Sequence, residues 1–318
     1  MLNKYISKEN GSLQEISAHS SEKGCWFNLI NPTAEEIKTV AKIIDISSLD
    51  FLKTSLDEEE RPHIEIDDNS LLIIINAPLM ESKNIFDTLP LGIIITLDYF
   101  ITVCLKENKV LSYFSPENAK YFDTSKKAPF ILQILFRSTK LYLKYLRDIN
   151  QQTDEIEMNL RKSMKNKALF DLLELEKSLV YFTTALKDNG IVMEKLSRLF
   201  KNKIFMHLLK VDEEEKDFLE DIIIENKQAI EMVEIHSNIL SSMMDAFASI
   251  ISNNLNIVMK FLTTMTILLA IPTMIASFWG MNVNVPWGET SNGFVYISVF
   301  AVIVTSITIF MLWKKTMF

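Results

Sequence analysis

Residues 261–279, FLTTMTILLAIPTMIASFW, and residues 294–313, FVYISVFAVIVTSITIFMLW, decide the class of this protein. They are 19 and 20 residues long and contain no charged side chain. An α-helix rises about 1.5 Å per residue, so each run can cross the roughly 30 Å hydrocarbon core of a bilayer. The alternative, two buried core helices, needs a soluble surface to cover them that the remaining sequence does not offer. We therefore predict two C-terminal transmembrane helices.

Positive charges flank these two runs on one side of the predicted membrane. Lys260 precedes the first run and Lys314–Lys315 follow the second, whereas residues 280–293 between them contain no Lys or Arg. By the positive-inside rule, both chain ends face the cytoplasm and the loop faces outside. Interfacial aromatic side chains belong at such ends, and the sequence has Trp279, Trp287 and Trp313 there. We expect a multi-pass protein of the cell membrane, in contact with lipid, with both termini cytoplasmic.

The rest of the chain is acidic. The charged side chains of residues 251–318 are Lys260, Glu289, Lys314 and Lys315, a net charge of +2, so the first 250 residues carry about −10 of the total −8. An acidic soluble part suits cations and disfavours nucleic acid as a partner. Cys25 and Cys104 are far apart and give neither a disulfide framework nor a metal-ligand spacing. Met1–Gly11 is polar, so we expect no cleavable signal peptide.

Two stretches without helix breakers predict long helices. Residues 130–189 and 191–271 contain neither Gly nor Pro and are rich in Leu, Ile, Met, Lys and Glu. The acidic run Asp212–Glu215 supplies a cap and a favourable first turn. From there the helical pattern continues through the first span to Trp279, which makes a rod of roughly 100 Å.

The first 128 residues predict a small α/β domain. Short β-rich runs occur at Ile64–Ile66, Leu71–Asn76, Leu91–Leu97 and Tyr99–Leu105, with turns at 67–69 and 97–99. A capping box, with Thr33 as N-cap and Glu36 at N3, opens a helix ahead of them. The expected domains are therefore an α/β domain (1–128), a long-helix stalk (129–256) and a two-helix transmembrane pore domain (257–318).

The tetrapeptide Trp279-Gly280-Met281-Asn282 ends the first span. We expect the helix to end at Gly280 and Asn282 to place a neutral amide at the mouth of a pore. Mg²⁺ gives up its water shell reluctantly, and a ring of amide oxygens can accept hydrogen bonds from that water without removing it. The alternative is that Gly280 only stops the helix and Asn282 only forms a turn.

Residues spaced by three or four share one face of the helix that leads to this tetrapeptide. They are Asp245, Ser249, Ser252, Asn256, Met259, Leu262, Thr266, Ala270, Thr273 and Ser277. The face is polar up to Asn256, apolar at Met259 and Leu262, and small or hydroxylated from there to the tetrapeptide. This order predicts a pore lining with a hydrophobic constriction that gates by dewetting. Alternatively, the two apolar residues only pack, and the hydroxyls bond back to the helix.

Gly-Met-Asn between two C-terminal spans, after a long helix and an acidic α/β domain, resembles the CorA family of Mg²⁺ transporters. Residues 253–263, NNLNIVMKFLT, are similar to the segment with which that family enters the membrane. The resemblance implies a funnel-shaped homopentamer whose central pore is lined by the first span of each subunit. It also implies Gly280, Met281 and Asn282 as the selectivity filter for Mg²⁺, with Co²⁺ or Ni²⁺ as further ions. The motif-specific part extends from about Asp245 to Asn282.

The resemblance further implies regulation by intracellular Mg²⁺. Asp221 and Asp245 fall where the family's stalk helix offers acids to an inhibitory Mg²⁺ between subunits. Asp57, Glu58 and Glu59 are the nearby candidates in the N-terminal domain.

The chain departs from the family pattern at two places. Trp279 stands where Tyr is usual, and the outer loop has the single acid Glu289 in place of an acidic Met-Pro-Glu-Leu segment. The second departure weakens the case for an external ring that concentrates cations.

Two rival functions fit the same scaffold less well. A Zn²⁺ transporter would favour His and Cys ligands, but His19, His63, His207 and His236 lie outside the spans and are not paired at ligand spacing. A membrane-anchored oligomeric scaffold gives no reason for the polar face. The sequence has no Gly-x-x-x-x-Gly-Lys-Ser/Thr run, nucleophile–base pair or metal cluster, so we expect neither an enzyme nor an organic cofactor.

Overall fold

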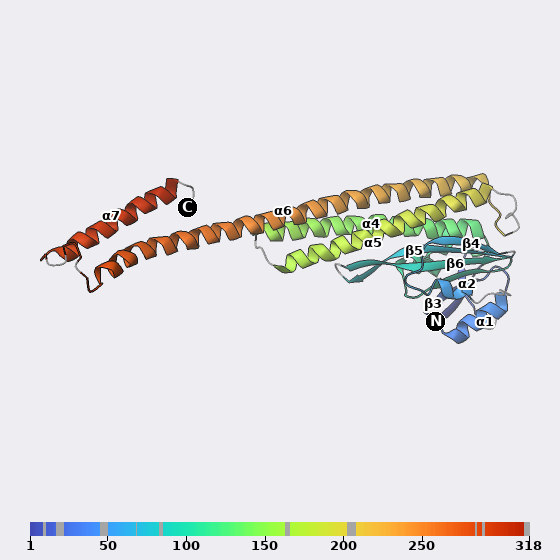
Figure 1. Ribbon diagram of the computed structural model, residues 1–318. Helices are drawn as coiled ribbons and strands as arrows, with labels where there is room; N and C mark the ends of the chain where they lie inside the picture. Colours follow the sequence, from blue (N-terminus) through green and yellow to red (C-terminus); the bar gives the residue numbers. More distant parts are fainter. Residues whose placement is uncertain are drawn as a thin grey trace. The chain divides into compact units, whose positions relative to one another are not determined.

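The computed structural model describes residues 1–318 except 9–10, 17–21, 45–49, 68, 83–84, 163–165, 202–207, 284, 288–289 and 315–318. The chain divides into two compact units, Met1–Ser242 and Met243–Phe318 (Figure 1). Helix α6 (Glu213–Trp279) contributes residues to both units. The division into three domains at residues 128 and 256 stays a prediction.

The described residues of the first unit form a seven-stranded sheet, in the order β2-β1-β3-β7-β6-β5-β4. Its strands are β1 (Leu2–Ser7), β2 (Leu13–Glu15), β3 (Trp26–Ile30), β4 (His63–Asp67), β5 (Ser70–Ser82), β6 (Ile85–Thr96) and β7 (Phe100–Cys104). The pair β3–β7 is parallel, and the other neighbouring strands are antiparallel. The α/β character of the N-terminal part is therefore confirmed.

The four strands expected from the sequence correspond to β4–β7, with a bend at Leu97–Asp98 as predicted. The expectation was too short for β5 and β6, which continue past Pro78 and start before Pro90. It missed β1, β2 and β3 altogether. These strands are short or mixed in polarity, and β3 also depends on pairing with β7, which is distant in sequence.

Alternation along β5 builds a core on each face of the sheet. Leu71, Ile73 and Ile75 face α4 (Lys127–Lys162) and α5 (Asn166–Lys201), where they share a buried cluster with Phe130 and Leu196. Side chains of period two point to opposite faces of a strand. The intervening Leu72 and Ile74 accordingly lie in the other cluster, with side chains of α1 (Ala34–Ile44) and α2 (Asp50–Thr54). The unit therefore has three layers, with helices on both faces of the sheet.

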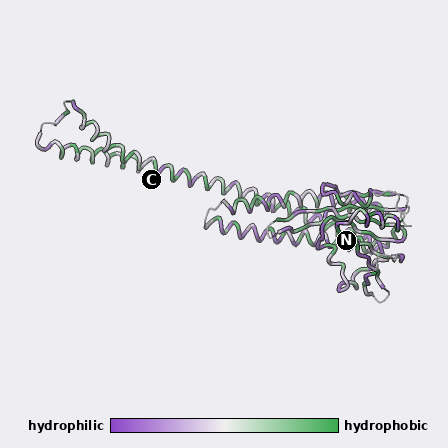
Figure 2. Tube along the Cα trace, turned by 90° about the horizontal axis from the view of Figure 1, so that it is seen from below, coloured by the Kyte–Doolittle hydropathy of each residue, from purple (hydrophilic) through white to green (hydrophobic). Residues whose placement is uncertain are grey.

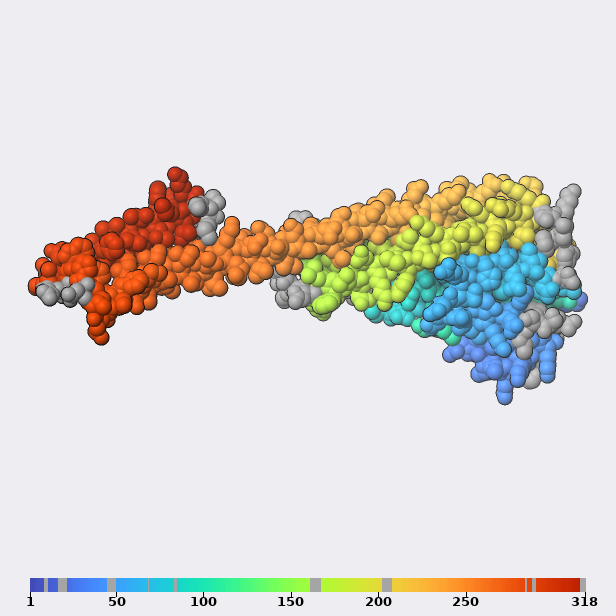
Figure 3. Space-filling view, in the orientation of Figure 1, coloured from blue at the N-terminus to red at the C-terminus, as the bar shows by residue number. Residues whose placement is uncertain are grey.

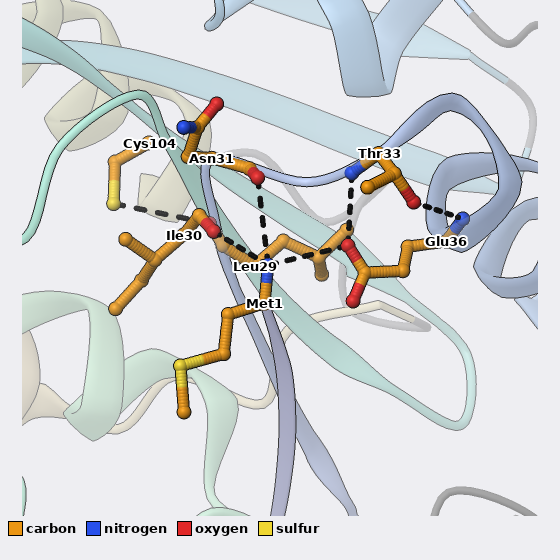
Figure 4. A network of polar contacts seen from close by, with 7 residues as sticks. All are labelled: Met1, Leu29, Ile30, Asn31, Thr33, Glu36 and Cys104. Carbon is orange, nitrogen blue, oxygen red and sulfur yellow. Dashed lines mark hydrogen bonds and ion pairs between the residues drawn. The ribbon is translucent and has the colours of Figure 1, made fainter.

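The capping box at the start of α1 is confirmed (Figure 4). The Thr33 N–H donates to Glu36 Oε2 at 2.8 Å, and the Glu36 N–H donates to Thr33 Oγ1 at 3.2 Å. The Met1 amino group also donates to Glu36 Oε2, at 3.2 Å, and to the Ile30 carbonyl, at 2.8 Å. Asn31 joins β3 to this helix with φ 43°, a left-handed conformation that Asn tolerates better than most residues.

Helices α4, α5 and the first part of α6 pack together in the first unit. The described residues of 130–189 are helical, in α4 and α5, and those of 191–271 are helical, in α5 and α6, except 208–212. Helix α6 begins at Glu213, and the Asp212 N–H donates to Glu215 Oε2 at 2.8 Å. Ion pairs Lys140–Glu225 (2.6 Å) and Lys187–Glu234 (2.7 Å) tie α6 to α4 and α5. Gly190 lies inside α5, where an added Cβ would be 3.1 Å from Asn226 Nδ2, so it permits close approach of α6.

The second unit consists of the C-terminal part of α6, a connecting loop and α7 (Gly293–Lys314). Hydrophobic residues run along both helices (Figure 2), and in the space-filling view α7 (red) presents its side chains at the surface (Figure 3). Both helices are long and apolar enough to cross a membrane, and 6% and 0% of their most apolar windows are buried. A core helix of a soluble protein would instead be mostly buried, so their exposure favours the predicted spans.

Candidate ion pathway

The C-terminal part of α6 carries the predicted pore-lining face. Thr266 Oγ1 donates to the Leu262 carbonyl and Thr273 Oγ1 to the Leu269 carbonyl, both at 2.8 Å. The hydroxyls therefore bond back to their own helix, as the alternative interpretation expected. This does not remove them from a pathway, because each oxygen keeps lone pairs that can accept hydrogen bonds from water. The face therefore offers hydrogen-bond acceptors. Water molecules around a cation point their hydrogens outward, so acceptors are the groups with which they can form hydrogen bonds.

These residues surround a groove on α6. Thr266, Ala270, Thr273 and Ser277 line it together with Leu269, Met274 and Phe278, and its volume is about 590 Å³. Four of the seven predicted pore-lining residues thus lie around one hollow. The other three, Asn256, Met259 and Leu262, are exposed on the same face further towards the start of the helix. Their role in lining a pore remains a prediction.

The face of α6 that meets α7 is a different one. Pro272, Ile275, Ala276 and Trp279 line a second pocket of about 570 Å³ together with Phe294, Ile297 and Ala301 of α7. With about 3.6 residues per turn, these α6 residues lie on the side of the helix opposite the groove. The chain's own second span therefore leaves the polar face uncovered.

The Gly-Met-Asn segment follows directly after α6. The helix ends at Trp279, and the Gly280 N–H still donates to the Ala276 carbonyl at 3.0 Å. The Met281 N–H donates to the Phe278 carbonyl at 3.4 Å, and the Val283 N–H donates to the Met281 carbonyl at 2.9 Å. Asn282 is exposed, so its amide is available at the end of the helix. The predicted helix end is confirmed to within one residue.

Sequence reasoning missed what the aromatic residues around this segment do. It assigned Trp279 and Trp287 to a membrane interface, but their rings stack, with centroids 6.1 Å apart and 8° between the planes. The signal was present in the sequence as two Trp residues that bracket Gly-Met-Asn. The contact itself depends on the backbone of the loop, which spacing alone does not give.

The candidate regulatory acids lie on exposed parts of the chain. Asp57, Glu58 and Glu59 follow α2 in the first unit, where Asp57 Oδ1 accepts the Glu59 N–H at 3.0 Å. Asp221 is exposed on α6 in the same unit, and Asp245 is exposed on α6 in the second. Within the described residues no three His, Cys, Asp or Glu side chains gather to hold a metal, so these acids form no site in one chain.

The described histidines do not form a zinc site. His63 Nδ1 lies 2.9 Å from the Arg61 carbonyl and 3.5 Å from Glu60 Oε1. His236 is half-buried on α6, and desolvation lowers its pKa, opposed by the negative charge of Asp154. His19 and His207 lie outside the described residues.

The fold and this site define a membrane protein in which a pair of C-terminal spanning helices follows an α/β unit and a long helix. A family model described as "CorA-like Mg2+ transporter protein" matches residues 21–315. The chain belongs to this family. The CorA resemblance inferred from the sequence is therefore confirmed, as is the predicted order of an α/β unit, a long helix and two C-terminal apolar helices.

The matches to relatives and to a solved structure cover nearly the whole chain. The cobalt/magnesium transport protein CorA of Methanocaldococcus jannaschii is 29% identical, over 90% of this chain and 88% of that protein. The magnesium transport protein CorA of Helicobacter pylori is 27% identical, over 91% and 89%. The complete structure of the CorA magnesium transporter from M. jannaschii matches with a TM-score of 0.83 at 26% identity, covering 100% of this chain and 99% of that one.

Proposed function

We propose that this chain transports hydrated Mg²⁺ across the cell membrane through a pore formed by several copies. The observation that carries the proposal is the ordered face of α6, whose acceptor-lined groove leads to Asn282 in a chain of the CorA-like family. The names of the relatives, which describe magnesium or cobalt/magnesium transport, support Mg²⁺ as the main ion and Co²⁺ as a further one.

The groove explains why copies are needed. In one chain the polar face is open, and a charged ion beside a single helix would remain exposed to lipid at high cost in free energy. A ring of α6 helices with this face inward encloses a polar path, and α7 lies outside it because it covers the opposite side of α6. Five copies are the number that the family resemblance implies.

Asn282 acts as the selectivity residue in this proposal. Its amide oxygen accepts a hydrogen bond from water in the first shell of Mg²⁺, an ion that dehydrates reluctantly. Ser277, Thr273 and Thr266 then offer further acceptors along the path without a fixed charge that would trap a divalent ion. Weak binding of this kind is what permits an ion both to enter and to leave.

Met259 and Leu262 form the gate. Both are apolar, exposed in the single chain, and on the face of α6 that carries the groove residues, so in a ring with that face inward they face the path. Apolar rings close a pore by dewetting when they approach one another. Met259→Gly and Leu262→Asn should each raise the leak current of reconstituted protein, and a leak equal to that of the wild type would remove the gate from this segment.

Cytoplasmic Mg²⁺ regulates the pore through the exposed acids Asp221 and Asp245. Like charges on neighbouring copies repel, so bound Mg²⁺ favours an arrangement in which the copies lie close together. Protection from protease should therefore rise with Mg²⁺ and should be lost in the double variant Asp221→Lys, Asp245→Lys. Asp57, Glu58 and Glu59 are the proposed partner acids.

The orientation proposed from Lys260 and Lys314 puts both chain ends in the cytoplasm and Gly-Met-Asn outside. A Zn²⁺ transporter remains the alternative ion choice on this scaffold. A membrane-anchored oligomeric scaffold remains the alternative without transport.

The variant Asn282→Ala tests the proposal. We expect loss of at least nine-tenths of Mg²⁺ uptake in a Mg²⁺-uptake-deficient cell, with unchanged membrane level and oligomer size. Asn292→Ala, an exposed Asn at the other end of the same loop, is the matched control and should transport normally. Wild-type uptake by Asn282→Ala would overturn the assignment, and rescue by Zn²⁺ rather than Mg²⁺ would favour the zinc alternative.

A further inference from the structure

Two Trp residues, one before and one after Gly-Met-Asn, lie against each other. Trp279 is the last residue of α6, and Trp287, eight residues later, stacks on it with nearly parallel rings. The chain between them contains Gly280, Met281 and Asn282. The two indoles therefore close this segment into a loop whose ends meet.

Trp287 is held in an unusual backbone conformation. Its φ is 59°, in the left-handed region that residues other than Gly rarely adopt. The Trp287 carbonyl accepts the Thr290 N–H at 3.2 Å and Thr290 Oγ1 at 2.7 Å. A bulky residue keeps such a conformation only when its surroundings enforce it, and strained positions of this kind cluster at functional sites.

Residues at the start of α7 also hold Trp287 in its left-handed backbone conformation. Gly293, the first residue of α7, is buried, and a Cβ there would come within 2.5 Å of the Trp287 carbonyl oxygen. Tyr296, one helical turn into α7, contacts the Trp287 ring, with centroids 6.4 Å apart. Trp287 is thus fixed from α7, and Trp279 is fixed by α6, so the stack joins the two helices at the end of the loop.

We propose that Trp287 is a positioning residue for the selectivity filter, acting through its stack on Trp279. The inference rests on the proposed function. Closing a flexible loop removes part of its conformational freedom. With both ends of the loop fixed, Asn282 has fewer positions to occupy, and a ring of amides can hold a hydrated ion only if each amide is in place. A Trp that only marks the membrane interface needs neither a left-handed backbone nor a stacked partner.

The test compares three Trp variants in the full-length protein. Trp287→Ala should lower Mg²⁺ uptake about tenfold and weaken discrimination of Mg²⁺ against Ca²⁺. Trp287→Phe keeps a ring on Trp279 and should retain at least half of the uptake and the discrimination. Trp313→Ala, which removes an exposed Trp at the other end of α7, is the control for a general interface role and should behave as the wild type.

A spectroscopic measurement checks the stack itself. Two stacked indoles give an exciton couplet in circular dichroism, which should disappear in both Trp287 variants and persist in Trp313→Ala. Should Trp287→Ala fail to reach the membrane, Gly293→Ala replaces it, because the added Cβ displaces the Trp287 carbonyl while all Trp residues remain. That variant should weaken both the couplet and the discrimination.

Normal uptake and discrimination in Trp287→Ala, beside loss of uptake in Asn282→Ala, would overturn the positioning role and leave the proposed function standing. Equal losses in Trp287→Ala and Trp313→Ala would also overturn it, since they would indicate an interface role. Normal uptake in Asn282→Ala would instead overturn the proposed function.

Discussion

Strand β5 and helix α7 are both runs of large aliphatic residues, yet they are used in opposite ways. Ile73, Ile74 and Ile75 in β5 are 0% exposed, whereas Val302 and Ile303 in α7 are 65% and 51% exposed. Burial of apolar surface contributes roughly 25 cal/mol per Å² to stability. The first unit buries its apolar side chains against other parts of the same chain. The second unit can bury its apolar side chains only against lipid or against other copies of the protein.

The largest effect on stability is expected from a substitution in the core of the first unit. Phe130 is fully buried, and its ring lies 4.4 Å from that of Phe100 and 5.2 Å from that of Trp26. Phe130→Ala should lower the free energy of unfolding of this unit by about 3–5 kcal/mol. The midpoint of its thermal transition in detergent-solubilised full-length protein measures this. Phe310→Ala in α7, where the side chain is 61% exposed, should leave that midpoint unchanged; equal shifts would refute the contrast.

A charge placed on each unit sharpens the comparison. Val302→Lys in α7 should reduce the amount of protein integrated in the membrane, because Lys near the centre of a span costs about 2.5–3.5 kcal/mol. Val180→Lys in α5, at a site that is 53% exposed, should change stability by no more than about 0.5 kcal/mol. Carbonate extraction followed by quantification of the membrane fraction measures the difference. Equal integration of both variants would mean that α7 is not in contact with lipid at Val302.

The smallest effect concerns the capped start of α1. The Thr33 N–H lowers the pKa of Glu36 by favouring its ionised form; desolvation partly opposes this shift, and the Met1 amine reinforces it. A lowered pKa stabilises the folded state above the unfolded pKa of about 4.3, and this contribution is lost as pH falls through the folded pKa. Glu36→Gln should therefore make the thermal midpoint of the first unit less sensitive to acid. Thr33→Ala should cost about 1 kcal/mol at neutral pH. An unchanged acid sensitivity in Glu36→Gln would exclude this carboxylate as a contributor.

The parts of the fold that sequence alone could predict are those with a strong local signal. Asp212–Glu215 marks the start of α6, the uncharged run 261–279 marks its end, and Thr33 with Glu36 marks the start of α1. Each depends on residues a few positions apart. Strand β3 could not be predicted in the same way, because its pairing with β7 depends on residues far along the chain.

In the candidate site, too, local features could be predicted from the sequence and long-range contacts could not. Spacing of three or four residues placed Thr266, Ala270, Thr273 and Ser277 on one face, since a helix repeats every 3.6 residues, and these four side chains line the groove. The stack of Trp279 on Trp287 could not be predicted, because it requires the left-handed backbone at Trp287 and the absence of a Cβ at Gly293. No local pattern specifies such a combination.

The parallel pairing of β3 with β7 has a consequence for the order in which the protein forms. The Trp26 indole N–H donates to Thr102 Oγ1 at 2.9 Å across 76 positions of the chain. Contacts of such long range slow folding, because closing the long intervening loop costs conformational entropy before the contact can form. Strands β1 and β2 join the sheet only through β3. During synthesis, β1, β2 and β3 therefore cannot pair with the rest of the sheet until residue 104 has left the ribosome. Strand β7 is the last strand made, and its pairing with β3 completes the sheet.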